Sequence, residues 1–300
     1  NNKYEFYNII RDSSTTIHAK SQKKLSYKLT LNNEFIKSFK KFNISTEFYN
    51  QYFDLKDKKI SSQEFNNQYF RSFPILGISL ETPFKFKKSF YNFIYTPKLS
   101  LVMSPGLSNS NKLSNEDSSI NSFTIDNNMN LNRFTGTDKL DNSKRINFGF
   151  NLNNDHLAAT FLQTYEFTNN SNFHYSQGNE NKLSDFLGIL SVTKNSLKTN
   201  YDFRYDSNES YLKSQKLTLG YNSYLGNFNF NYLDQNSKVD EIIVSDLETL
   251  NYEFKSKKIN KFSEITYFGL YDLKNEINTE SGISYSYFDE CFGVNIDFKR

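Results

Sequence analysis

Apolar and polar residues alternate with a period of two along most of this chain. In FGVNIDFKR, residues 292–300, every apolar side chain is followed by a polar residue or a glycine. The stretches RINFGFNLN at 145–153 and LKTNYDFRYD at 197–206 repeat the pattern. Successive side chains of a β-strand point to opposite faces, so the pattern predicts strands with one apolar and one polar face.

The length of the alternating stretches indicates the kind of sheet. Strands of soluble domains usually have about 5 to 6 residues, whereas a tilted strand needs about 9 to 11 residues to cross a membrane. Segments rich in Asn, Asp, Ser and Gly separate the long stretches and are typical of turns. With about 18 residues per strand and connection, the sequence predicts an all-β fold, an antiparallel transmembrane β-barrel with about 14–18 strands. The stretches that reach or approach the crossing length are 157–169, 197–206, 211–222, 262–272 and 278–287.

The composition agrees with a barrel in lipid. Hydrophobic residues make up 37% of the chain, which is low for a protein with one large core, while the 17% of aromatic residues are all Phe or Tyr. A barrel needs no large core, because its apolar side chains face the lipid and its polar ones face the lumen. Nucleotide bias is an alternative source of the Asn excess, but it cannot explain the order of the residues. On this basis we expect these side chains to face outward: Phe148, Phe150, Tyr201, Phe203, Val294 and Ile296.

Charge and motifs give no indication of catalysis. The net charge is +3, with 36 basic and 33 acidic residues, and no block of five like charges suggests nucleic-acid binding. His18, His156 and His174 have no metal-ligand spacing to one another or to other ligands. Phosphate-binding and nucleophile motifs are missing from the sequence. We therefore expect no enzyme, no cofactor, no metal site and no nucleic-acid partner.

One region interrupts the alternation. All four prolines lie between residues 74 and 105, and a long Ser- and Asn-rich stretch follows them. Long connections without regular structure are usually functional or disordered. We predict that 104–127 forms an extended loop that folds partly over or into the barrel mouth, with Asn115, Glu116 and Asp117 hydrogen-bonded to barrel residues.

The most specific segment covers residues 115–150 and resembles a known family. It contains the triplet Asn115, Glu116 and Asp117, then Asp126, then a motif of Arg133, Phe134, Thr135, Gly136 and Asp138, and then Arg145 before an alternating strand. In this order the residues resemble the outer-membrane lipopolysaccharide-assembly family LptD, the organic solvent tolerance proteins. Stretches 71–84 and 275–300 resemble flanking strands of that family. The chain departs from the family pattern at Lys139, where Arg is usual, and at Asp141–Asn142, where the family tends to have an acidic residue and Gly.

The resemblance implies a function and partners. Members take lipopolysaccharide from a periplasmic bridge protein through an N-terminal domain. They insert it into the outer leaflet of the cell outer membrane. A lipoprotein plug subunit occupies the lumen of their barrel. It also implies a barrel of about 26 strands. We therefore expect residues 1–300 to be a single barrel segment, incomplete and truncated at both ends. The alternatives are a generic outer-membrane porin or receptor, and a secreted all-β binding protein with a soluble sandwich.

Two further expectations concern the charged side chains of the motif and the cysteine. Charged side chains at Arg133, Asp138 and Arg145 suit a polar lumen, where they would form an ion-pair network that braces the wall, with direct substrate contact as the alternative. The single cysteine, Cys291, has no partner within the chain, so its thiol is buried, reactive or paired elsewhere. The resemblance implies that Cys291 lies at a periplasmic turn and forms a disulfide with a cysteine outside this chain.

Overall fold

A computed structural model describes the chain at residues 2–10, 21–60, 63–88, 91–107, 109–110, 113, 115, 117–118, 124–168, 181–239 and 242–300. Almost all regular structure is β-strand, with one short helix. The elements are β1 (Asn2–Ile10), β2 (Ser21–Lys37), β3 (Lys40–Ile60), β4 (Gln63–Glu81), β5 (Phe84–Lys88), β6 (Tyr91–Met103), α1 (Ile125–Asn128), β7 (Lys144–Asn153), β8 (Leu157–Glu166), β9 (Phe186–Lys194), β10 (Leu197–Asp206), β11 (Tyr211–Asn222), β12 (Gly226–Val239), β13 (Ile242–Ser256), β14 (Ser263–Asp272), β15 (Ile277–Phe288) and β16 (Gly293–Lys299).

The strands form a single 16-stranded sheet in sequence order, with β1 and β16 as its terminal strands. β5 lies off this order and pairs with β6. Antiparallel neighbours joined by short turns are the arrangement that period-two alternation predicts. The predicted all-β antiparallel fold class is confirmed, and the strand count falls within the predicted 14–18.

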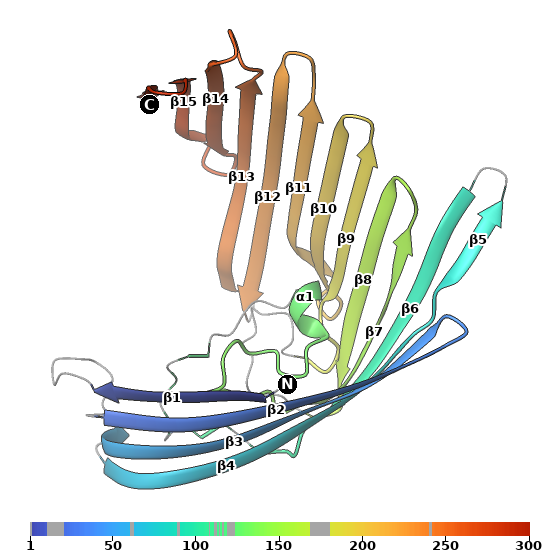
Figure 1. The fold of residues 1–300 in the computed structure, drawn as a ribbon, viewed down its shortest axis with the longest axis vertical. Helices are drawn as coiled ribbons and strands as arrows, with labels where there is room; N and C mark the ends of the chain where they lie inside the picture. The colour runs from blue at the N-terminus through green and yellow to red at the C-terminus, as the bar shows by residue number, and fades with distance from the viewer. Residues whose placement is uncertain are drawn as a thin grey trace. The chain divides into compact units, whose positions relative to one another are not determined.

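The chain divides into two compact units. The first comprises residues 1–83, 97–149 and 163–184, and in it β1 to β4 run side by side (Figure 1). β3 and β4 have 21 and 19 residues, far more than the predicted crossing length. They pair almost without interruption from Lys41↔Glu81 to Ile60↔Gln63. These lengths were not predicted, because alternation identifies a strand but does not show where it ends.

The core of the first unit lies on one face of its sheet, which we call the covered face because the described residues of 104–143 pack on it. Its cluster of buried side chains is Tyr49, Phe73, Ile75, Val102 and Leu140. Of these, Leu140 comes from the covering segment and the other four from strands. Phe148 lies on the opposite face from Arg145 and is 39% exposed, as the alternation predicts.

The second unit comprises residues 84–96, 150–162 and 185–300. Its strands carry two different faces. On one, the aromatic face, the rings of Tyr95, Phe150, Phe161, Phe186 and Phe203 follow one another across neighbouring strands, with centroid distances from 4.9 to 5.9 Å. The opposite, polar face carries contacts such as Asn229 to Glu253 and Lys255 to Glu264. Each strand therefore has the amphipathic character that the sequence predicts.

Within the described ranges, the structure holds no helix with the length and apolar character that a membrane crossing requires.

Candidate functional site

The described residues of 104–143, between β6 and β7, form a covering segment on the first unit. Its two ends are tied together, because Ser143 N donates to Ser104 Oγ at 2.7 Å and Ser104 N donates to the Ser143 carbonyl at 3.0 Å. Near its middle lies α1, which begins after Thr124. There the Thr124 hydroxyl and the Asn127 side chain each accept a backbone N–H from the other residue, a capping box. The sequence does not predict this helix, since a single turn is too short to produce a helical period.

The two sequence motifs form one structural unit within this segment. The Asp117 carboxylate accepts the backbone N–H of Thr137 at 3.0 Å and that of Asp138 at 2.7 Å. In return, Asp117 N donates to the Asp138 carboxylate at 3.1 Å. Gly136 has a φ of +76°, a conformation that suits glycine. Asp117 of the triplet and the turn at 136–138 thus fix one another, although about twenty residues separate them.

Lys24 of β2 binds both motifs. Its ammonium lies 2.6 Å from Asp138 Oδ1, 2.5 Å from Thr137 Oγ1 and 3.2 Å from Asp117 Oδ2. The Lys24 side chain is fully buried. A buried charge is stable only when it is paired and hydrogen-bonded, and here two carboxylates and a hydroxyl surround it.

β3 and β4 hold the same turn through its backbone. Gln51 Nε2 and the Arg71 guanidinium each donate to the Thr137 carbonyl at 2.9 Å, and Arg71 also donates to the Asp138 carbonyl at 2.8 Å. Side chains from three consecutive strands therefore hold residues 137–138. We call Lys24, Gln51, Arg71, Asp117 and Asp138 the Lys24 cluster.

The hydrogen bonds of the Lys24 cluster shift the acidity of Asp117. Burial by itself would raise the pKa of this carboxyl. The backbone N–H of Asp138, the Ser118 hydroxyl and the charge of Lys24 together hold the pKa well below its usual range. Asp117 is therefore charged when the segment is in place.

A second buried cluster joins the segment to β7 and β8. Arg133 lies 2.5 Å from Asp141 and 2.5 Å from Glu166, and Arg145 lies 3.0 Å from Asp141. The hydroxyl of Ser143 donates to Glu166 at 2.7 Å. All four charged side chains are 3% exposed or less. With two cations and two anions, this Arg133 cluster is electrically neutral, which limits the free-energy cost of its burial.

The candidate residues from the sequence occupy different positions in this arrangement. Arg133, Phe134, Asp138 and Arg145 are buried, each 5% exposed or less. Asn115 closes a local turn, where its side chain accepts Ser118 N at 3.0 Å. Of the triplet, Asp117 contacts β2 through Lys24, whereas Asn115 bonds to Ser118 within the segment instead of to a strand, and Glu116 lies outside the described residues. The burial of the charged members favours bracing over direct contact with a bulky lipid.

Sequence reasoning did not find the strand residues that hold the segment, namely Lys24, Gln51, Arg71 and Glu166. Alternation places Lys24 on the polar face of its strand, but its partner Asp138 lies 114 residues away. Nothing in the sequence distinguishes Lys24 from the other basic residues at polar strand positions. The motif residues could be found, but their partners could not.

The second unit has a buried charge cluster of its own. Lys213 lies 3.2 Å from Asp185 and 2.7 Å from Asp206, and its side chain is 1% exposed. The register between β10 and β11 shifts here, so that Arg204 pairs with Ser214 and Tyr205 with Leu212. This bulge leaves Lys213 without an opposite residue and directs it toward the two carboxylates.

The remaining candidates show no ligand geometry. Within the described ranges, no three His, Cys, Asp or Glu side chains are placed to hold a metal ion. His156 lies in the β7–β8 turn, where its ring contacts the Thr193 carbonyl at 3.2 Å, and His18 and His174 lie outside the described residues. Cys291 is an exposed free thiol in the β15–β16 turn, in which Asp289 accepts the Cys291 backbone N–H at 2.9 Å. Its disulfide to a residue beyond this chain stays a prediction.

Comparison with protein families identifies the family of this chain. A family model described as "LptD: LPS transport system D" matches residues 1–279. The match begins well before residue 71, where the resemblance becomes clear by eye, and it includes both motifs of the covering segment. No curated protein matches the chain.

Proposed function

Because this chain belongs to the LptD family of outer-membrane lipopolysaccharide transport proteins, we propose that it forms part of the wall of a lipopolysaccharide translocon. In this proposal the protein inserts lipopolysaccharide into the outer leaflet of the cell outer membrane. The observation that carries it is the family match over residues 1–279. The separation of each strand into an apolar and a polar face supports it, because a wall between lipid and a hydrated lumen requires both.

The covering segment has a structural part in the proposal. In both clusters the charged side chains pair with one another, so we propose that they stabilise the position of the segment rather than bind lipid. A segment held by five strands keeps one conformation while an amphipathic lipid passes. We propose that Arg133, Asp138 and Arg145 act in this way, with Asp117 and Gly136 forming the turn that they hold.

The lengths of the connections support a direction of the chain across the membrane. Neighbouring strands are antiparallel, so successive connections lie at opposite ends of the strands. Outer-membrane barrels place short turns in the periplasm and long loops outside the cell. We therefore assign the covering segment to the outer side and the Cys291 turn to the periplasmic side. From β6 onward, the connections on the outer side include 104–143, 167–185, 207–210 and 273–276, and those on the periplasmic side are 154–156, 195–196, 223–225, 257–262 and 289–292.

The partners follow from the same proposal. The transported molecule is lipopolysaccharide, a lipoprotein plug subunit occupies the lumen, and a periplasmic bridge protein delivers the lipid through an N-terminal domain. Residues 1–300 would then be one segment of the barrel.

Depletion of the full-length protein in its own cells tests the transport function. We expect newly made, radiolabelled lipopolysaccharide to stop reaching the cell surface and to accumulate in the inner membrane, with recovery when the full-length gene is restored. Passage of small solutes across the outer membrane is the control, since loss of a porin would reduce it and leave lipopolysaccharide delivery intact. Unchanged delivery after depletion would contradict the proposal.

A further inference from the structure

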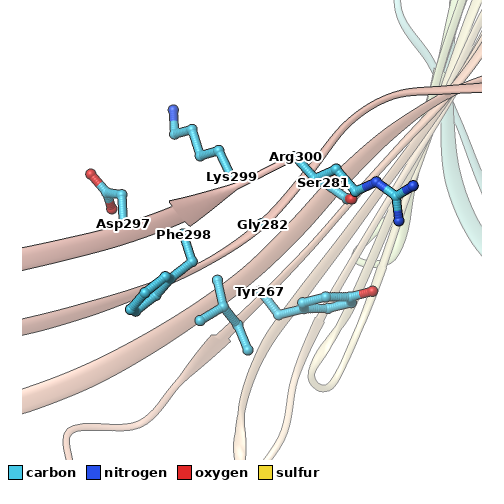
Figure 2. A pocket seen from close by; sticks show the side chains of 8 residues that line it. Tyr267, Ser281, Gly282, Asp297, Phe298, Lys299 and Arg300 are labelled. Carbon is cyan, nitrogen blue, oxygen red and sulfur yellow. The ribbon is translucent and has the colours of Figure 1, made fainter.

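An uninterrupted strand of the second unit separates its apolar side chains from its charged ones. Figure 2 shows this on β16, where Phe298 projects from one side of the sheet while Asp297 and Lys299 project from the other. Successive residues of a strand must alternate in this way. A charged residue at an apolar position of an unbroken strand would therefore lie on the apolar face. β11 carries one such residue, Lys213.

The alternation of β11 would place Lys213 on the aromatic face. Gln215 pairs with Phe203, whose ring is part of that face. Two residues earlier, an unbroken strand would bring Lys213 to the same face, opposite Tyr205. Instead the register shifts by one residue, and Tyr205 pairs with Leu212. The bulge thus places Leu212 on the aromatic face and turns Lys213 toward the polar face.

The polar face holds two carboxylates that need a cation at this point. Tyr205 pairs with Phe186, so their neighbours Asp206 and Asp185 lie side by side across β10 and the start of β9. Both residues are buried, with 2% and 1% of their surfaces exposed. Like charges at opposite positions of a strand pair repel one another, and burial strengthens the repulsion.

The Lys213 ammonium contacts both carboxylates. It lies 3.2 Å from Asp185 Oδ1 and 2.7 Å from Asp206 Oδ2. Arg204 Nε adds a second cation at 3.4 Å from Asp185, so the cluster holds two positive and two negative charges. In an unbroken register the carboxylates would lose the ammonium, and Leu212 would take its place opposite Asp206.

We propose that Lys213 sets the register of the β10–β11 hairpin by selecting the bulge over the unbroken pairing. The bulge disrupts the backbone ladder, because one residue of β11 has no counterpart on β10. The ion pairs of Lys213 with Asp185 and Asp206 outweigh that cost. They also hold the turn that follows, since Asp206 accepts the backbone N–H of Asn208 at 2.8 Å. The inference goes beyond the proposed transport function and does not rest on it.

Disulfide formation between introduced cysteines measures the register. Directly opposite residues of an antiparallel pair are close enough for a disulfide, whereas residues on opposite faces are not. Full-length protein with Tyr205→Cys and Leu212→Cys reports the bulged register. Full-length protein with Tyr205→Cys and Lys213→Cys reports the unbroken register, in which alone these two positions face one another. After oxidation of the folded protein, mass spectrometry measures the fraction of each cysteine pair that is protected from alkylation.

Removal of the Lys213 charge should release the register. With Lys213 present, we expect the 205/212 pair to be almost completely oxidised. With Lys213→Met, whose side chain suits the aromatic face, oxidation of this pair should fall to a minor fraction, and the 205/213 pair should oxidise readily. Lys216→Met is the matched control, because Lys216 lies on the polar face of the same strand opposite Asp202 but is exposed. It should leave the 205/212 pair oxidised. Lys213→Ala replaces Lys213→Met if that variant fails to fold.

Two results would overturn the inference. Unchanged oxidation of the 205/212 pair in Lys213→Met would show that the backbone keeps the bulge without the lysine. Equal losses in Lys213→Met and Lys216→Met would show that the register depends on the total charge of the polar face and not on Lys213. Either result would leave the proposed transport function standing, because the measurement concerns one hairpin and not the delivery of lipopolysaccharide.

Discussion

Gly136 lies directly against Asp117. A Cβ atom on Gly136 would come within 2.3 Å of the Asp117 carbonyl oxygen and 2.7 Å of its carboxylate. Gly136 also has a φ of +76°. Two separate requirements, a left-handed backbone and close approach by a second motif, therefore call for glycine at this position. The contact explains why the sequence carries Gly between Arg133 and Asp138.

Substitution Gly136→Ala should release the covering segment. The backbone strain costs about 1–3 kcal/mol, and the clash with Asp117 adds to it. The control is Gly106→Ala, because Gly106 has a φ of +86° but a Cβ there would meet no atom within 4 Å. Urea-unfolding midpoints and protease cleavage within 104–143 should shift for both variants because both carry the backbone strain, and the shift should be larger for Gly136→Ala by the cost of the clash with Asp117. Equal shifts would show that the contact with Asp117 adds nothing.

Substitution Lys24→Met should be among the most damaging changes on the covered face. It leaves the buried carboxylate of Asp138 without the Lys24 cation and removes one partner of Asp117, which typically costs about 3–5 kcal/mol. Lys28 is the matched control, since it lies on the same strand and face and pairs with Glu47 at 2.6 Å, but its side chain is 25% exposed. Lys28→Met should cost about 1 kcal/mol or less. Chemical denaturation of both variants measures the difference, and similar losses would contradict a special role for Lys24.

The lowered pKa of Asp117 predicts acid sensitivity of the segment. The folded pKa lies below the ordinary value of 3.8, so the stabilising contribution is present above that value and is lost as the pH falls below it. Protease cleavage within 104–143 should rise as the pH drops below about 4. Asp117→Asn should weaken the segment at neutral pH and flatten this dependence. A wild-type profile that coincides with that of Asp117→Asn would show that another group is responsible.

The strands could be predicted well because the alternation that identifies a strand lies within the residues of that strand. The stretches 197–206 and 211–222 match β10 and β11 in both bounds. Alternation also placed Phe148 and Arg145 on opposite faces. This information is local, since the side chains of one strand alternate whatever lies beside it.

The candidate site could be predicted only in part, for a related reason. The motif around Gly136 contains local conformational requirements that can be read from the sequence. Its partners Lys24 and Arg71 lie on strands far away in the chain, and only the register of the folded sheet brings them to Thr137. The unusual length of β3 and β4 depends on that same pairing. The bulge at Lys213 has no residue signature, because it arises from a mismatch between two strands.

The ring of Phe203 lies over Gly188, its direct partner across β10 and β9. A Cβ at Gly188 would meet this ring at 2.2 Å, whereas one at Gly220 would find its nearest neighbour, Asn229, at 3.6 Å. Gly188→Ala should therefore displace the ring and destabilise the sheet by about 1–3 kcal/mol. Gly220→Ala should be neutral or stabilise the strand by about 0.5–1 kcal/mol, because alanine loses less conformational freedom on folding. Urea-unfolding midpoints of the two variants provide the comparison.

A second substitution separates the clash from a general intolerance of alanine. If the Phe203 ring is the obstacle, Phe203→Leu should lower the additional cost of Gly188→Ala, because a smaller side chain leaves room for the methyl group. The double-mutant cycle measures this coupling, which we expect to be about 1 kcal/mol and favourable. Strictly additive losses would mean that the strand backbone, rather than the ring, requires glycine at position 188. Coupling would show that the glycine creates the space in which the aromatic rings of neighbouring strands pack together.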